Sequence, residues 1–168
     1  RSYDRPSPFS HRTAPARPMT CVLERKTRVR RPLEETFRFF ADPRNLAEIT
    51  PGWLAFRLLD TGDLEMRRGL RLHYRIRPLG FPQRWTSEIT VWDPPHRFVD
   101  EQVEGPYRAW RHTHEFRALP DGGTEVRDRV EYELPFGLIG RLAHALLVKH
   151  QLRAIFDYRA RRIRELLA

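Results

Sequence analysis

Hydrophobic and polar residues alternate along the middle of the chain, which is the pattern of half-buried β-strands. The turns between the alternating segments are rich in Gly, Pro and Asp, as in "PLGFP", "DPP", "EGP" and "PDGG". Such short connections join antiparallel neighbours, so the pattern predicts an antiparallel meander. The expected strands are 22–30, 53–60, 69–78, 84–92, 97–104, 107–118 and 124–134.

Two parts of the chain follow a helical period instead. The stretch "PLEETFRFFADP" has a proline in its first turn, acidic residues near its start and a second proline at its end, and it predicts a short helix. A second short helical turn is expected over 45–49. Residues 138–167 carry apolar side chains at three- and four-residue steps, which predicts one long amphipathic helix.

The order of these elements indicates the fold class. One strand, two short helices, a run of antiparallel strands and one long helix predict an α+β fold, in which a curved sheet wraps around the C-terminal helix. A cavity is expected wherever the side chains of helix and sheet do not meet. Residues 1–18 hold four prolines and four arginines without an apolar period, so we expect a flexible tail before a single domain over 19–168.

Composition limits the class of protein and the cellular compartment. Hydrophobic residues make up 40% of 168 residues, enough for one domain with a core. No apolar run is long enough to span a bilayer, so stable membrane insertion is not expected. Cys21 is the only cysteine, which excludes a disulfide framework and favours a reducing, cytoplasmic location.

The net charge of +9 raises the question of nucleic acid. All basic residues except Lys26 and Lys149 are arginine, and they are scattered over the polar faces of the expected strands and of the last helix. We therefore interpret them as a solvated surface and expect no nucleic-acid partner. Lys149 lies within the apolar stripe of the last helix, where we expect its side chain to extend outward to solvent.

Three stretches together resemble the START-like, or SRPBCC, superfamily: "RPLEETFRFFADPRNLAEITP", "WDPPHRFVDEQVEGPYRAWRHTHEF" and "GTEVRDRVEYELPFGLIGRLAH…LRAIFDYRARRI". The resemblance covers about residues 20–168 and is to the small bacterial ligand-binding branch, beside polyketide cyclases and lipid-transfer domains. It implies a helix-grip fold with a hydrophobic cavity, and as a rule no metal. It does not imply one reaction, because this fold hosts binders, carriers and enzymes.

The stretch "YRAWRHTHEF" (107–116) places two histidines on one face of a strand. The alternate face is uniformly polar, so His112 and His114 should point inward. The next strand has one inward acid, Asp128. If the "PDGG" turn pairs Ala118 with Thr124, His114 lies opposite Asp128, with Cβ atoms about 5 Å apart. A buried carboxylate needs a partner, so the sequence predicts a His114–Asp128 pair, with His112 diagonal to it.

This pair allows more than one role. A histidine oriented by a carboxylate suits acid–base catalysis, with His114 and Asp128 as candidate catalytic residues, or it orients a ligand or stabilises the sheet. Two histidines and a carboxylate would also suit zinc or non-haem iron. We expect no metal or other cofactor, because Asp128 is better placed to fix a ring and His73, another histidine, falls on the polar side of its strand.

The same alternation of inward and outward side chains predicts which residues line a ligand pocket. On the strand 84–92 the inward set would be Trp85, Ser87, Ile89 and Val91. For the strand 97–104 the alternation does not decide which face points inward. The inward set is either Val99, Glu101 and Val103 or Phe98, Asp100 and Gln102. The residues expected to line the pocket are Leu72, Tyr74, Trp85, Ile89, Trp110, His112, His114, Phe116, Val130, Tyr132, Leu152 and Phe156.

Two functions fit these expectations. The first is the binding or transport of a small hydrophobic ligand, such as a lipid, an isoprenoid or a polyketide-like aromatic, between the sheet and the C-terminal helix. The alternative is an enzyme of the cyclase or dehydratase type that uses the His–Asp pair and no metal. A third possibility, an interaction through the basic surface, lacks any basic stretch interleaved with aromatic residues.

Overall fold

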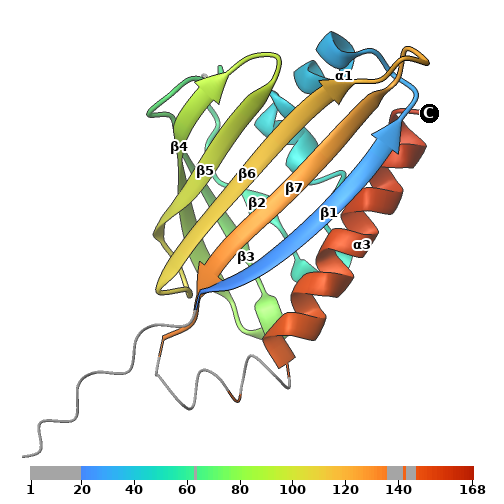
Figure 1. Cartoon of the computed structure of the whole chain (residues 1–168). Helices are drawn as coiled ribbons and strands as arrows, with labels where there is room; N and C mark the ends of the chain where they lie inside the picture. Colours follow the sequence, from blue (N-terminus) through green and yellow to red (C-terminus); the bar gives the residue numbers. More distant parts are fainter. Residues whose placement is uncertain (1–19, 63, 136–141, 143–146) are drawn as a thin grey trace, which may run out of the picture.

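The structure, a computed structural model, describes residues 20–62, 64–135, 142 and 147–168. Seven antiparallel strands form one curved sheet in the order β1-β7-β6-β5-β4-β3-β2, and α3 lies along its concave side next to β1 (Figure 1). The strands are β1 Cys21–Val29, β2 Arg57–Leu58, β3 Arg71–Ile76, β4 Gln83–Asp93, β5 Arg97–Glu104, β6 Ala109–Ala118 and β7 Thr124–Glu133. The helical elements are α1 Leu33–Phe40, η1 Pro43–Leu46, η2 Gly52–Leu54, η3 Pro78–Gly80 and α3 Lys149–Leu166. The predicted helix-grip arrangement is confirmed.

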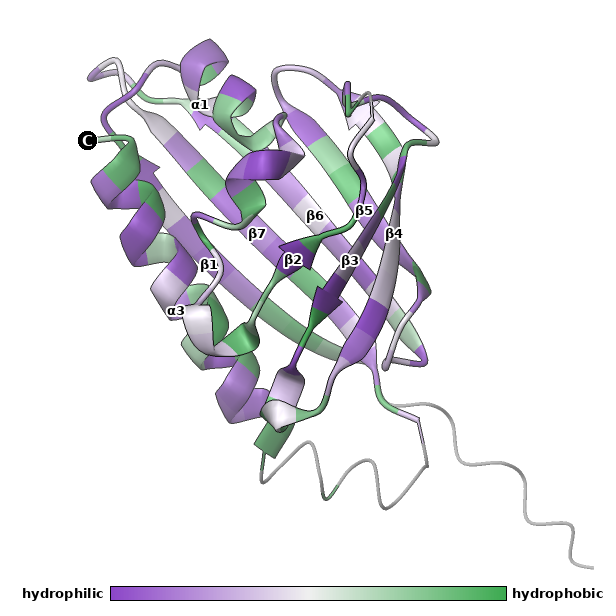
Figure 2. Ribbon diagram, turned by 180° about the vertical axis from the view of Figure 1, so that it is seen from behind, coloured by the Kyte–Doolittle hydropathy of each residue, from purple (hydrophilic) through white to green (hydrophobic). Residues whose placement is uncertain are grey.

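The register between β6 and β7 follows from the turn between them. Ala118 pairs with Thr124, which places His114 opposite Asp128, as the sequence predicts. Alternate residues of β7 then face the interior, and Val126 and Val130 are completely buried. Figure 2 shows the concave side of the sheet, where apolar and polar residues alternate along the strands.

Helix α3 closes the concave side. It buries Leu152, Phe156, Ala160 and Ile163, which lie at three- and four-residue steps on one face. Lys149, its first residue, is exposed, in agreement with an outward-directed side chain. The expected start of this helix over 138–146, apart from exposed Leu142, lies outside the described residues, as does the expected tail over 1–18.

The region predicted as a strand over 53–60 differs from the expectation. Pro51 and Gly52 begin a 3-10 turn, and Ala55 adopts the left-handed conformation with φ 46°. Only Arg57–Leu58 pair with β3, at the edge of the sheet. The apolar residues that suggest a strand serve instead to cover the cavity, since Leu54 and Phe56 line it.

A β-bulge in β4 corrects a second expectation. The register with β5 shifts between Ile89 and Val91, so the extra residue reverses which side chains face inward. Ile89 faces the interior before the bulge. Beyond it Trp92 takes the inward place expected of Val91, with its ring 5.2 Å from Phe37 and 5.9 Å from Phe98.

The short helix α1 fills one end of the concave side. Its Phe37 and Phe40 pack edge-on against Phe116 at 5.2 and 5.0 Å between ring centroids. Aromatic contacts of this kind add to the free energy gained from burial. This end is therefore solid, and the open part of the interior lies farther along the sheet. No helix in the described part of the chain is long and apolar enough to cross a membrane.

Candidate functional site

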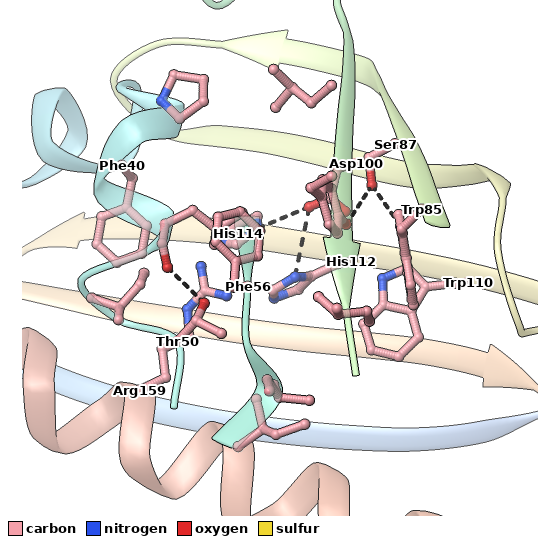
Figure 3. Close-up of a pocket in the computed structure, with 18 of the residues that line it drawn as sticks. Phe40, Thr50, Phe56, Trp85, Ser87, Asp100, Trp110, His112, His114 and Arg159 are labelled. Carbon is pink, nitrogen blue, oxygen red and sulfur yellow. Dashed lines mark hydrogen bonds and ion pairs between the residues drawn. The ribbon is translucent and has the colours of Figure 1, made fainter. Parts of the chain in front are cut away.

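A cavity of about 180 Å³ lies between the inner face of the sheet, α3 and the turns that follow α1 (Figure 3). Most of its wall is apolar or aromatic. β3 and β4 supply one side, α3 supplies Leu152, Ile155 and Phe156, and the turns supply Leu46 and Ile49. β5 and β6 contribute Asp100, His112 and His114 to the wall, and other polar side chains come from β3, β4, α3 and the turns.

Nine of the residues expected to line a pocket do line this cavity: Leu72, Tyr74, Trp85, Ile89, Trp110, His112, His114, Leu152 and Phe156. Phe116, Val130 and Tyr132 do not, and the expectation for them is corrected. Phe116 packs beneath α1, and Val130 and Tyr132 are covered by α3 and β1. Their inward direction is correct, but strand alternation does not tell which inward side chains another element will cover.

The two histidines and two acids form one cluster, in which His112, His114 and Asp128 are buried and Asp100 is partly buried. Nε2 of His112 donates to Oδ1 of Asp128 at 2.9 Å, and Nε2 of His114 donates to Oδ1 of Asp100 at 3.1 Å. His114 and Asp128 are direct cross-strand neighbours, and Nδ1 of His114 lies 3.1 Å from Oδ1 of Asp128 without hydrogen-bond alignment. The hydrogen-bonded pair is thus the diagonal one, His112–Asp128, rather than His114–Asp128.

Burial and neighbouring charges set the protonation of this cluster. Burial, with repulsion from His114, lowers the pKa of His112 to about 4, although the hydrogen bond to Asp128 opposes this. Burial alone would raise the pKa of Asp128, but the hydrogen bond from His112, the nearby ring of His114 and the charge of Arg159 hold it well below its usual range. The pKa of Asp100 is lowered in the same way, mainly through His114 against the effect of burial. The carboxylates are therefore charged at neutral pH and His112 is not.

A second polar group lies beside the cluster. The indole Nε1 of Trp85 donates to Oγ of Ser87 at 3.0 Å, and the hydroxyl of Tyr74 lies 3.1 Å from the same oxygen. Burial raises the pKa of Tyr74 far above its usual value, so its hydroxyl keeps its proton and remains a hydrogen-bond donor or acceptor.

The sequence reasoning misses several residues of the site, among them the charged residues Asp100 and Arg159. Asp100 belongs to β5, whose inward face the pattern left open, and the structure places Phe98 and Asp100 in the cavity wall. Arg159 projects from α3 into the same wall, between the rings of Phe40 and Phe156 at 5.9 Å from each. Its steps of three from Phe156 and four from Ile163 place it on the inner stripe, a signal available in the sequence.

A family model described as "polyketide cyclase / dehydrase and lipid transport" matches residues 29–155, most of the chain. The chain belongs to this family. The expected START-like membership is thereby confirmed, and the match includes most residues that line the cavity, the histidine cluster and the first turns of α3. Within this family the chain is a ligand-binding domain of the START type. None of the curated proteins compared with the chain matches it.

Solved structures of this family's fold superpose on the chain at low sequence identity. A START superfamily protein from Mycobacterium smegmatis is 11% identical, with a TM-score of 0.63 over 87% of this chain and 96% of its own. The protein TTHA0849 from Thermus thermophilus is 20% identical, with a TM-score of 0.64 over 88% and 100%. Truncated norcoclaurine synthase from Thalictrum flavum is 17% identical, with a TM-score of 0.64 over 85% and 92%. These likenesses establish the fold.

Proposed function

We propose that this protein binds a small, largely apolar molecule in the cavity between its sheet and α3. The observation that supports this best is the cavity itself, which lies between the sheet and α3 and has mostly apolar and aromatic walls. An apolar cavity of about 150 Å³ accommodates benzene in an engineered protein. The cavity of this protein, at about 180 Å³, has room for a compact ring system or a short branched chain.

The polar groups of the wall favour a ligand with one polar end. Nε of Arg159 is buried and has no hydrogen-bond partner among the described residues. A buried donor without a partner costs free energy, and an oxygen atom of a ligand would remove that cost. The ligand would place a carboxylate or carbonyl oxygen beside Arg159 and its apolar body against Trp85 and Trp110.

Binding can be tested with protein purified untagged from cells. Native mass spectrometry should reveal a co-purifying small molecule, and the fluorescence of Trp85 and Trp110 should change when aromatic acids are titrated in. Ile155→Trp fills the cavity from α3 and should abolish both signals. Leu166→Trp, at an exposed position of the same helix, is the matched control. Equal behaviour of the two variants would contradict the proposal.

A second candidate function is catalysis of the cyclase or dehydratase type. It is supported by the two histidines, each hydrogen-bonded to a carboxylate, at the wall of the cavity. Such a ring can move a proton at a bound carbonyl compound. His114→Gln should then remove turnover of a polyketide-type substrate and leave its binding within a few-fold of the wild type. Parallel loss of both would favour the binder.

A further inference from the structure

We propose that Asp100, His112 and His114 form a binding site for one divalent transition-metal ion such as Zn²⁺ or Fe²⁺. The three residues come from neighbouring strands, β5 and β6, and all three line the cavity. One donor atom from each lies within 4.8 Å of the other two. This inference goes beyond the binding of an apolar ligand and does not depend on it.

The distances among the donors are those of a chelating set. Oδ1 of Asp100 is 3.1 Å from Nε2 of His114 and 3.6 Å from Nδ1 of His112. Two donors that bind one ion at about 2.1 Å are about 3.0–3.4 Å apart, so an ion needs only small shifts of the side chains. Two imidazoles and one carboxylate are the ligand set of open non-haem iron sites and of catalytic zinc sites with a histidine pair.

Asp128 supports the two histidine rings on the side opposite Asp100. The opposite nitrogens of the two rings, Nε2 of His112 and Nδ1 of His114, lie 2.9 and 3.1 Å from the same oxygen of Asp128. Metal-bound histidines regularly direct their second ring nitrogen at a carboxylate, which fixes the ring and strengthens it as a ligand. Each ring therefore has one nitrogen toward Asp128 and the other toward Asp100. Figure 3 shows the contacts of both rings with Asp100.

Neighbouring aromatic side chains hold the two histidine rings in place, and the side of the proposed metal site that faces the cavity stays open. The ring of His114 stacks on Phe98 with centroids 4.1 Å apart, and the ring of His112 packs edge-on against Phe156. The protein supplies three ligands, and the remaining coordination positions face the cavity, where a ligand oxygen or water can bind. Arg159 lines the same cavity, and its positive charge repels a cation. Both negative charges, of Asp100 and of Asp128, are therefore needed to offset this repulsion and hold a divalent ion.

The test uses the whole, untagged chain after removal of metals with a chelator. Calorimetric titration with Zn²⁺ should give one ion per chain, and Co²⁺ should give the visible absorption of a four- or five-coordinate site. Asp100→Asn and His114→Gln should each lower the affinity by more than tenfold. Asp128→Asn, which touches no ion, should lower it by about 10–100-fold and shift the Co²⁺ spectrum.

The control is a second His–carboxylate pair, on the outer side of the sheet. Nδ1 of His73 lies 2.9 Å from Oδ1 of Asp60 on the outer side of β3, where the histidine is half exposed. His73→Gln should leave the metal affinity unchanged. A wild-type chain that binds neither ion at a ratio of one overturns the proposal. Binding that survives Asp100→Asn, or that His73→Gln reduces as much, also overturns it, and circular dichroism identifies variants that fail to fold.

Discussion

His112 forms its hydrogen bond with Asp128 across the diagonal of two strands, at 2.9 Å, although the register places His114 directly opposite that acid. The diagonal bond leaves His114 turned toward Asp100 on the other neighbouring strand. One acid on each side, Asp128 on β7 and Asp100 on β5, thus holds the pair of rings. The consequences for stability, pH dependence and binding can be measured separately.

Asp128→Ala should lower the free energy of unfolding by about 3 kcal/mol, because the substitution leaves the buried ring of His112 without its hydrogen-bond acceptor and removes the carboxylate beside His114. The matched substitution is Asp60→Ala, which breaks the half-exposed pair with His73 and should cost less than about 1 kcal/mol. Urea denaturation followed by circular dichroism measures both. Similar costs would mean that the buried cluster contributes no more than a surface ion pair.

The metal-free protein should lose stability as the pH falls from about 6.5 to about 4. In the folded state His112 binds a proton only near pH 4, whereas in the unfolded state it does so near 6.5. Between these values the unfolded state holds more protons, so acidification favours unfolding, by up to about 3 kcal/mol from this group. Denaturation at a series of pH values in the presence of chelator should show this slope, and His112→Gln should flatten it. An unchanged slope in the variant would assign the effect to other groups.

Arg159→Gln should weaken the binding of an aromatic carboxylic acid about tenfold and leave the matching neutral alcohol nearly unaffected, because only the acid presents a charged acceptor to the guanidinium. Fluorescence titrations of the cavity tryptophans give both affinities. Arg161→Gln removes an arginine of α3 that instead lies over the ring of Tyr158 and is exposed. If both variants lose affinity equally, the general positive charge of the helix is responsible.

Ile163→Ala should destabilise the protein by about 3 kcal/mol, because this side chain of α3 is completely buried among residues of the sheet and α1. Leu166→Ala removes a partly exposed side chain of the same helix and should cost well under 1 kcal/mol. Thermal unfolding ranks the two variants. The reverse order would show that α3 packs on the sheet through a different face.

The fold followed from local patterns, since strand alternation, turn residues and the helical stripe all describe single segments. The inward direction of His112, His114 and Asp128 followed from the same alternation and one short turn. Asp100 could not be placed, because both faces of β5 mix apolar and polar residues and only pairing with β4 and β6 distinguishes them. The choice of hydrogen-bond partners depends on ring orientations, which no sequence pattern encodes.

The bulge in β4 marks where the hollow part of the interior ends. The inward residues before it, Trp85, Ser87 and Ile89, border the cavity, whereas Trp92 beyond it is wedged among the phenylalanines beneath α1. One additional residue in a single strand thus separates the part of the sheet that borders the cavity from the part that packs against α1. Relatives that shift this irregularity by two positions along the strand would lengthen or shorten the chamber without altering the topology of the sheet.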